Sequence, residues 1–369
     1  MSNTVAIPQL ASGPIPSLDG LRAIAVSLVF FAHSQLEYII PGGLGVTIFF
    51  VLSGYLITTL MRVEYARSGR VSFRWFYLRR CLRLLPPLLI TVAAAGVLSG
   101  LMLIDGAFSP RGLLAVLFYF GNYHVIAENF QGIPAGLGVV WSLAVEEHFY
   151  LLFPPLAVLL LRSGSRQLAA ATLTALCAAV LAWRCHLVLD GAPVAHITMA
   201  TDTRIDAILV GCLMALACNP WLDHVPPPHR WRDGSLAAVC LAVLSATLLY
   251  RNDFFRNTAR YTLQSLAIAP LIYLAVARAT CAPFRWLNAR PMVYLGVTSY
   301  AIYLTHQVIL LGIERHWPRF GWLGTTLIGA ALTLTVAELL RRWIEEPCAR
   351  LRKSLHRDYT SSVPATARA

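Results

Sequence analysis

The chain has 369 residues, of which 57% are hydrophobic and only 13% are charged. Soluble domains carry about 25% charged residues, so this composition excludes an ordinary soluble protein and indicates a polytopic membrane protein. The formal net charge of +12 does not indicate nucleic-acid binding, because the arginines gather in short loops between apolar spans, as in a positive-inside bias. The eight cysteines show no CxxC spacing, so neither a disulfide framework nor a metal site is expected.

The first predicted membrane span, Leu21–Ile40, begins in the stretch LDGLRAIAVSLVFFAH and carries Asp19, Arg22 and His33 at its polar positions. On a regular helix Arg22 and His33 share one face, about 16 Å apart along the axis. Such groups cost several kcal/mol in a bilayer unless they face the bundle interior or an aqueous cavity, which favours a functional role. The alternative is structural: Arg22 extends to the lipid headgroups and His33 bonds a neighbouring helix.

The second predicted span is Val46–Met61, with Ser53 and Gly54 at its middle, where either a ligand or another helix can approach the backbone. Residues 62–83 follow with seven arginines against one acid, the strongest cytoplasmic marker in the chain. Arg79, Arg80 and Arg83 have helical spacing there. Guanidinium groups match phosphate bidentately, so this cluster suits a phosphorylated ligand; the alternative is that it only sets the topology.

The remaining predicted spans are 88–104, Trp141–Leu161, 168–189, 204–218, 235–250, 262–278, 292–312 and 322–343. Together these spans give an all-α bundle of about ten membrane helices with both termini in the cytoplasm. The segment 113–126 is expected not to cross, because its apolar part is shorter than the ~20 residues that a bilayer requires. Inner loops then hold twenty basic residues and outer loops seven. The predicted organisation is a cytoplasmic tail 1–16, a membrane domain 17–345 and a second cytoplasmic tail 346–369.

This topology places several polar residues in the outer halves of four helices: His33, Glu146 and Glu147, Arg204 and Asp206, and His306. An isolated carboxylate or histidine in a membrane helix is often structural. Several such groups at similar depth indicate a cavity with chemistry.

The chain resembles the acyltransferase-3 family of integral membrane O-acyltransferases across roughly residues 17–350. The matching pieces are LDGLRAIAVSLVFFAH, GVTIFFVLSGYLI, RRCLRLLPP, WSLAVEEHFYLLFPP, TDTRIDAILVG, LGVTSYAIYLTHQ and EEPCAR. The resemblance implies ten spans and transfer of acetyl or related groups from cytoplasmic acyl-CoA to sugars on the other side. It also implies that His33 and Arg22 are an essential pair, that Arg80 and Arg83 form the Arg-x2-Arg motif, and that Glu146 is the essential carboxylate. Ala23 stands where the family often has Gly, and Thr305 where a Trp usually precedes the histidine. Some relatives carry a fused extracytoplasmic esterase-like domain, which is not expected in this chain.

The residues and the resemblance together predict an O-acyltransferase of the bacterial inner membrane. Acetyl-CoA is the expected donor, and the expected acceptor is a glycan or glycoside, lipid-linked or free; no tightly bound cofactor, metal or nucleic acid is expected. His33 serves as general base or transient acyl carrier, Glu146 orients it, Arg22 helps to hold the thioester, and Arg79, Arg80, Arg83 and Ser53 bind the donor. The expected substrate cavity consists of Asp19, Glu147, Arg204, Asp206 and His306. The alternatives are a carrier or flippase for a lipid-linked sugar, against which the lack of an inverted repeat argues, and a proton-coupled channel.

Overall fold

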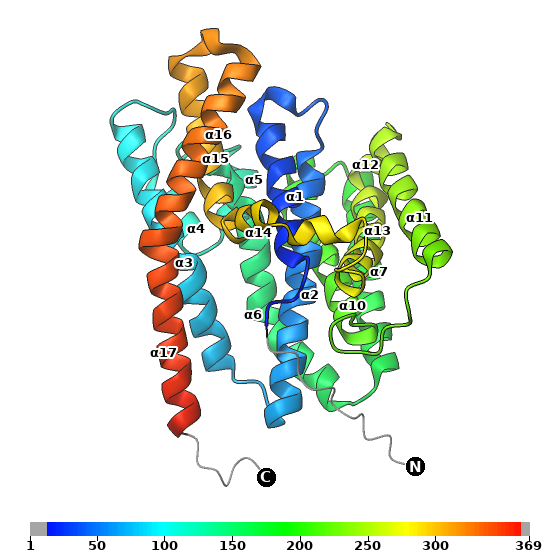
Figure 1. The fold of residues 1–369 in the computed structure, drawn as a ribbon. Coiled ribbons are helices and arrows are strands. Elements are labelled where there is room, and N and C mark those ends of the chain that lie inside the picture. The colour runs from blue at the N-terminus through cyan, green and yellow to red at the C-terminus, as the bar shows by residue number, and fades with distance from the viewer. Residues whose placement is uncertain (1–12, 363–369) are drawn as a thin grey trace, which may run out of the picture. The chain divides into compact units, whose positions relative to one another are not determined.

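Every regular element of the described residues is a helix. The computed structural model describes residues 13–362, with side chains up to Leu355. In chain order the elements are α1 (Leu18–Phe31), η1 (Ala32–Leu36), α2 (Gly42–Ser68), α3 (Phe73–Gly100), α4 (Pro110–Leu117), α5 (Gly121–Ala127), η2 (Leu137–Val140), α6 (Trp141–Arg162), α7 (Arg166–Leu189), α8 (Val194–Met199), α9 (Thr201–Arg204), α10 (Asp206–Ala217), α11 (Arg230–Leu249), α12 (Asp253–Asn257), α13 (Ala259–Ala277), η3 (Phe284–Asn288), α14 (Arg290–Val297), α15 (Ser299–His316), η4 (Pro318–Phe320), α16 (Gly321–Leu340), η5 (Arg341–Glu345) and α17 (Glu346–Ser362) (Figure 1). The predicted all-α class is confirmed for this part of the chain.

Seven helices of the described residues are long and apolar enough to cross a membrane, or up to eight when the bent pair α14–α15 counts as one span. The predicted first span is shorter than expected, because regular helix α1 has 14 residues. The span expected at 204–218 consists of α9 and the 12-residue α10, and the span expected at 292–312 bends by 69° between α14 and α15. A polytopic helical bundle is thus confirmed, whereas the number ten and the side of the termini stay predictions.

The segment 113–126 and the two predicted tails were expected to lie outside the membrane spans. The segment 113–126 lies in α4 and α5, of 8 and 7 residues, and neither is long enough to cross. The predicted C-terminal tail begins as helix α17, which follows α16 through one π-helical turn. Residues 1–12 and 363–369, which make up most of the first predicted tail and the end of the second, lie outside the described residues.

The chain divides into two compact units. Unit 1 comprises the residues up to Ala25 together with Gly43–Arg70 and Val145–Val297, and unit 2 comprises Val26–Gly42, Val71–Ala144 and the residues from Thr298 onward. The division falls within α1, after Ala25, and within α6, before Val145.

Unit 1 is built around α10, which packs against α7 and α13, while α11 packs against α13. Helix α2 also lies directly on α10, backbone against backbone. A Cβ atom on Gly54 would lie 1.9 Å from the carbonyl oxygen of Ile208, and one on Gly211 would lie 2.1 Å from that of Val51. Gly54 is therefore required by a close helix contact, which is the structural alternative considered for the Ser53–Gly54 pair.

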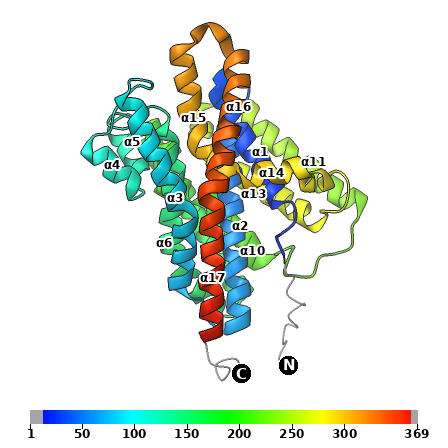
Figure 2. The same ribbon diagram turned by 60° about the vertical axis from the view of Figure 1, so that its left-hand side comes forward.

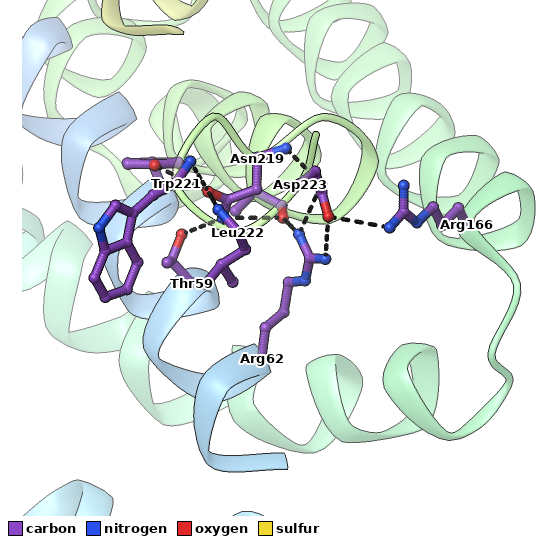
Figure 3. Close-up of polar contacts among 9 residues, drawn as sticks. Thr59, Arg62, Arg166, Asn219, Trp221, Leu222 and Asp223 are labelled. Atoms are coloured by element: carbon purple, nitrogen blue, oxygen red, sulfur yellow. Dashed lines mark hydrogen bonds and ion pairs between the residues drawn. The ribbon is translucent and has the colours of Figure 1, made fainter. Parts of the chain in front are cut away.

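The loop after α10 is fixed to two other helices of unit 1 by Asp223 (Figure 3). Asp223 accepts two hydrogen bonds from the Arg62 guanidinium, at 2.8 and 3.2 Å, and one from Arg166 at 3.0 Å. It also accepts the backbone N–H of Asn219, whose side chain donates to Thr59 of α2. Burial alone would raise the pKa of Asp223, but these hydrogen bonds and the two positive charges outweigh it, so its pKa lies below the ordinary value.

Replacing Asp223 by Asn is expected to lower the free energy of unfolding by about 1.5–3 kcal/mol at pH 7, because two guanidinium groups lose their charged partner. A depressed carboxylate pKa contributes stability above the unfolded-state value of about 3.9 and loses it as the pH falls through the lower folded-state value. The stability gap between wild type and Asp223→Asn should therefore narrow below about pH 4. Thermal unfolding in detergent across pH 3–7 checks this, and a gap independent of pH would refute the assignment.

Unit 2 is built around the hairpin of α15 and α16, and α17 runs beside α3 (Figure 2). The Tyr300 hydroxyl at the start of α15 donates to the Leu84 carbonyl of α3 at 2.7 Å. Farther along α15, the Tyr303 hydroxyl donates to the Val139 carbonyl and lies 2.7 Å from the Ser142 hydroxyl. Helix α15 thus fixes α3 and the segment before α6 within one unit.

Candidate active site

His33 lies in the π-helical turn η1, directly after the regular part of the first helix. Ser34 (φ −92°, ψ 40°) and Gln35 (φ 67°, ψ 20°) leave the helical conformation. The Ser34 hydroxyl donates to the Phe31 carbonyl, and the Gln35 amide donates to Glu314 of α15. The expectation of a regular helix to Ile40 is therefore wrong. The expectation that Arg22 and His33 share one face stays a prediction. Irregular turns of this kind are frequent at functional sites.

The imidazole of His33 pairs with that of His306, and both residues belong to unit 2. His33 Nδ1 lies 3.0 Å from His306 Nε2, and the ring centroids are 5.1 Å apart. His306 is 0% exposed, whereas His33 is partly exposed. The other ring nitrogen of His306, Nδ1, lies 3.1 Å from the Ile302 carbonyl oxygen and 2.8 Å from that of Tyr303. Two of the residues selected from the sequence are thus in direct contact, although 273 positions separate them.

The arginines selected as donor-binding residues, Arg79, Arg80 and Arg83, lie on α3 in unit 2. The expected helical spacing is confirmed, because α3 runs without a break from Phe73 to Gly100. The Arg80 guanidinium lies 6.0 Å from the centre of the Phe76 ring. Arg83 precedes Leu84, whose carbonyl accepts the Tyr300 hydroxyl of α15. This row is therefore attached to the helix that carries His306.

The C-terminal elements of unit 2 bring further charges to this row. The carboxylate of Glu345 in η5 is close enough to Arg83 for their charges to interact, and Arg352 of α17 is likewise close to Arg79. Glu345 and Arg352 were not selected from the sequence, although Glu345 is the first residue of the matching motif EEPCAR. Their proximity to α3 depends on the packing of η5 and α17 against α3, which is a contact between segments far apart in the sequence.

Asp19 and Arg22 form an ion pair at the start of α1 in unit 1. Arg22 Nη1 donates to Asp19 Oδ1 at 3.1 Å, one helical turn away. The backbone around them is closely covered by the segment of η3 and α14. A Cβ on Gly20 would lie 2.2 Å from the Leu287 carbonyl oxygen, and one on Gly296 would lie 1.8 Å from that of Asp19. Gly20 of the LDGLR motif is thus needed for this contact, and the guanidinium of Arg22 has an anionic neighbour.

Glu146 and Glu147 lie near the start of α6, in unit 1. The buried Tyr150 hydroxyl, one turn farther along the helix, donates to Glu146 Oε2 at 2.8 Å. His148 Nδ1 on the same helix lies 2.7 Å from the Thr201 hydroxyl of α9.

Ser53 is half-buried on α2. The roles assigned from the sequence to Arg22, Glu146, Glu147 and Ser53 stay predictions.

Arg204 and Asp206 are buried in a network of unit 1 that also includes Arg184 of α7. Asp206 Oδ1 lies 2.7 Å from Arg184 Nη2, and both side chains are 0% exposed. Asp206 Oδ2 accepts the Thr262 hydroxyl at 2.6 Å, and Arg184 donates to the carbonyls of Thr203 and Thr258. Arg204 donates to the Thr198 carbonyl and the Thr47 hydroxyl, with its guanidinium carbon 3.9 Å from the centre of the Tyr261 ring.

These contacts connect Arg204 and Asp206 to other helices of unit 1. Their place in a substrate cavity stays a prediction. Arg184 was missed from the sequence, and the signal that could have found it is an arginine inside the apolar stretch 168–189. Such a charge requires a partner on another helix. Within the residues whose side chains are described, no group of three or more His, Cys, Asp or Glu side chains could hold a metal ion.

Comparisons with known proteins agree on one family. The acyltransferase-3 family model, described as an acyltransferase domain, matches residues 15–342. The peptidoglycan O-acetyltransferase OatA of Listeria monocytogenes is 29% identical over 353 residues, which cover 90% of this chain and 55% of that protein. The "Putative peptidoglycan O-acetyltransferase YrhL" of Bacillus subtilis (strain 168) is 32% identical over 358 residues, which cover 90% of this chain and 54% of that protein.

The chain therefore spans little more than half the length of these relatives. No solved structure matches it. The family match nevertheless covers most of the chain, from the start of the LDGLR helix to η5, and includes both histidines of the pair and the arginine row of α3. This protein belongs to the acyltransferase-3 family.

Proposed function

We propose that this protein is a membrane O-acetyltransferase that moves an acetyl group from cytoplasmic acetyl-CoA to a hydroxyl of a bacterial surface glycan or glycoside, lipid-linked or free. The proposal places it in the inner membrane, with the donor entering from the arginine-rich side. Support for acetyl transfer comes from the family and from the relatives, whose names describe peptidoglycan O-acetyltransferases.

The observation that carries the proposal is that α15 contacts both His33 and the backbone of α3 beside the arginine row. Tyr300 bonds the backbone of α3 beside Arg83, and His306, six residues later, bonds the imidazole of His33. Six residues correspond to about 9 Å of helix rise. A row of guanidinium groups suited to phosphate and a partly exposed imidazole suited to proton transfer thus belong to one unit. A sugar carrier has no need of such a pair.

The reaction follows from these groups. The arginine row binds the phosphates of CoA and so orients the thioester. The acceptor hydroxyl oxygen bonds to the thioester carbonyl carbon while its proton moves to the imidazole of His33. When the tetrahedral intermediate collapses, the carbon–sulfur bond breaks, and the proton held by His33 leaves with the thiolate as free CoA. The acetylated acceptor remains, and His33 returns to its neutral form.

The donor site is tested by reversing two charges of the row, Arg80→Glu with Arg83→Glu. Each lost charge-assisted contact is worth about 1.5–3 kcal/mol, so acetyl-CoA affinity should fall by about 100-fold or more. The matched control is Arg70→Glu with Arg74→Glu, which changes the net charge equally at two exposed positions next to the row. Titration of the purified proteins with acetyl-CoA measures both affinities.

Replacing Arg80 and Arg83 by Lys should restore only part of the affinity, because lysine keeps the charge but not the bidentate geometry. Equal acetyl-CoA affinity in the two charge-reversed proteins would show that the donor phosphates bind elsewhere.

A further inference from the structure

The hydrogen bonds of His306 indicate which nitrogen of His33 carries a proton; the backbone of Val29 also hydrogen-bonds the His33 ring. A neutral imidazole has one N–H donor and one acceptor nitrogen. His306 Nδ1 faces the carbonyl oxygens of Ile302 and Tyr303, at 3.1 and 2.8 Å, and carbonyl oxygens only accept. His306 Nδ1 therefore carries the proton, and its Nε2 is the acceptor. His33 Nδ1, 3.0 Å from that acceptor, must be the donor.

A charged His306 would be the other way to arrange these protons, with N–H groups on both ring nitrogens. His306 is 0% exposed, and its ring lies among Phe30, Tyr303 and His33. An isolated cation in such surroundings carries a large desolvation cost, and no carboxylate hydrogen-bonds this ring among the described residues. The neutral form is therefore favoured.

We propose that His306 is a positioning residue, which holds His33 in the Nδ1–H tautomer so that His33 Nε2 presents its lone pair to the acceptor hydroxyl. The inference rests on the proposed function, in which His33 is the general base, and adds a residue that acts through it. His306 is fully buried and so is shielded from a substrate, whereas the partly exposed His33 is accessible to one. In many active sites a carboxylate orients the catalytic base. Here the neutral imidazole of His306 takes the place of that carboxylate, and His33 is the base.

The hydrogen bond between His33 and His306 also stabilises His33 when its imidazole is protonated during the reaction. When His33 Nε2 takes the proton of the acceptor hydroxyl, the imidazolium keeps its Nδ1–H bond to His306 Nε2. A hydrogen bond from a charged donor is stronger than one between neutral groups, so His306 favours the protonated intermediate without accepting a net charge itself. The two carbonyls that fix His306 belong to its own helix, so this orientation is built into α15.

Two substitutions separate positioning from packing. His306→Leu fills the space of the imidazole but removes the nitrogen that accepts the hydrogen bond from His33. His306→Gln keeps a hydrogen-bond acceptor, the amide oxygen, at about the position of Nε2. We expect His306→Leu to lower kcat by about 10- to 100-fold, the effect that losing the orienting partner of a metal-bound histidine typically has, with little change in KM for acetyl-CoA. His306→Gln should recover most of the rate. Equal losses in both variants, or a loss that appears in KM alone, would overturn the proposal.

The tautomer is measured without activity. In ¹⁵N solid-state NMR of the histidine-labelled protein in lipid, the His33 signals are those absent from His33→Gln. We expect a protonated Nδ1 and an unprotonated Nε2 in the wild type at neutral pH, and loss of this signature in His306→Leu. A proton on Nε2 of His33 in the wild type would refute the proposal directly.

The rates of these variants also distinguish the proposed role of His33 from that of His306. If His33→Gln transfers acetyl groups normally, the proposed role of His33 fails, whatever its tautomer. If His33→Gln is inactive and His306→Leu is as active as the wild type, only the positioning role fails.

Discussion

Replacing His33 by Gln is expected to lower the rate of acetyl transfer by about 10²- to 10⁴-fold, the usual cost of losing a general base. Glutamine keeps hydrogen-bonding groups at this position but does not take up a proton near neutral pH. If His33 only bonded its neighbour, Gln would replace it with little effect. The measurement is the single-turnover rate of acetyl transfer at saturating acetyl-CoA, together with the affinity for acetyl-CoA, which should not change.

His316→Gln is the matched control for this substitution. His316 lies at the end of α15, and its Nε2 lies 3.0 Å from the Leu103 carbonyl oxygen, so it also makes a structural hydrogen bond within unit 2. It has no part in the proposed reaction, and its variant should transfer acetyl groups at the wild-type rate. Near-normal transfer by His33→Gln would remove His33 from the mechanism.

Replacing Asp206 by Asn is expected to lower the free energy of unfolding by about 3–5 kcal/mol, because it leaves the Arg184 guanidinium buried without a counter-ion. Both side chains are 0% exposed and 2.7 Å apart, so water is not available to either charge. The matched control is Asp253→Asn in the exposed Arg256–Asp253 pair, whose carboxylate side chain is 90% exposed. An exposed pair contributes at most about 1 kcal/mol. Denaturant titration in detergent micelles, followed by tryptophan fluorescence, measures both.

A double-mutant cycle that combines Asp206→Asn with Arg184→Leu tests whether the loss of unfolding free energy comes from the ion pair of these two residues. Removing both charges should cost clearly less than the sum of the two single changes, because neither charge is then left alone in the interior. Additive losses would show that the two residues act independently, and the network around Asp206 would have to be reassigned.

The sequence predicts the long apolar helices well and their interruptions poorly. Apolar stretches such as 168–189 and 235–250 correspond to α7 and α11, because hydropathy over about twenty residues largely decides whether a helix can span a bilayer. The irregular turn after α1 coincides instead with a contact to a distant residue, and the bend between α14 and α15 falls inside a predicted span. Gln35 leaves the helical conformation while its side chain bonds Glu314, which no local pattern of the first helix indicates.

The candidate site was predictable as a set of residues but not as a set of contacts. His33 and His306 are conspicuous as histidines in apolar helices, and the α3 arginines as a helically spaced cluster at the end of an arginine-rich segment. Their partners are determined by tertiary packing: the sequence motifs do not indicate that His306 bonds His33, or that Asp206 meets Arg184 of α7. The need for glycine at Gly20 and Gly54 was equally hidden in the sequence, because the backbone that packs against each glycine lies far away along the chain.

The central claim is that this protein breaks the thioester of acetyl-CoA and transfers its acetyl group. The most direct measurement uses purified protein in liposomes, with radiolabelled acetyl-CoA and a panel of N-acetylglucosamine oligosaccharides and isolated bacterial surface glycans. The prediction is that free CoA thiol and labelled O-acetyl groups on an acceptor appear in equal amounts with the wild type, and that His33→Gln yields neither. Intact acetyl-CoA, together with movement of a lipid-linked sugar across the bilayer, would contradict the claim and identify a carrier.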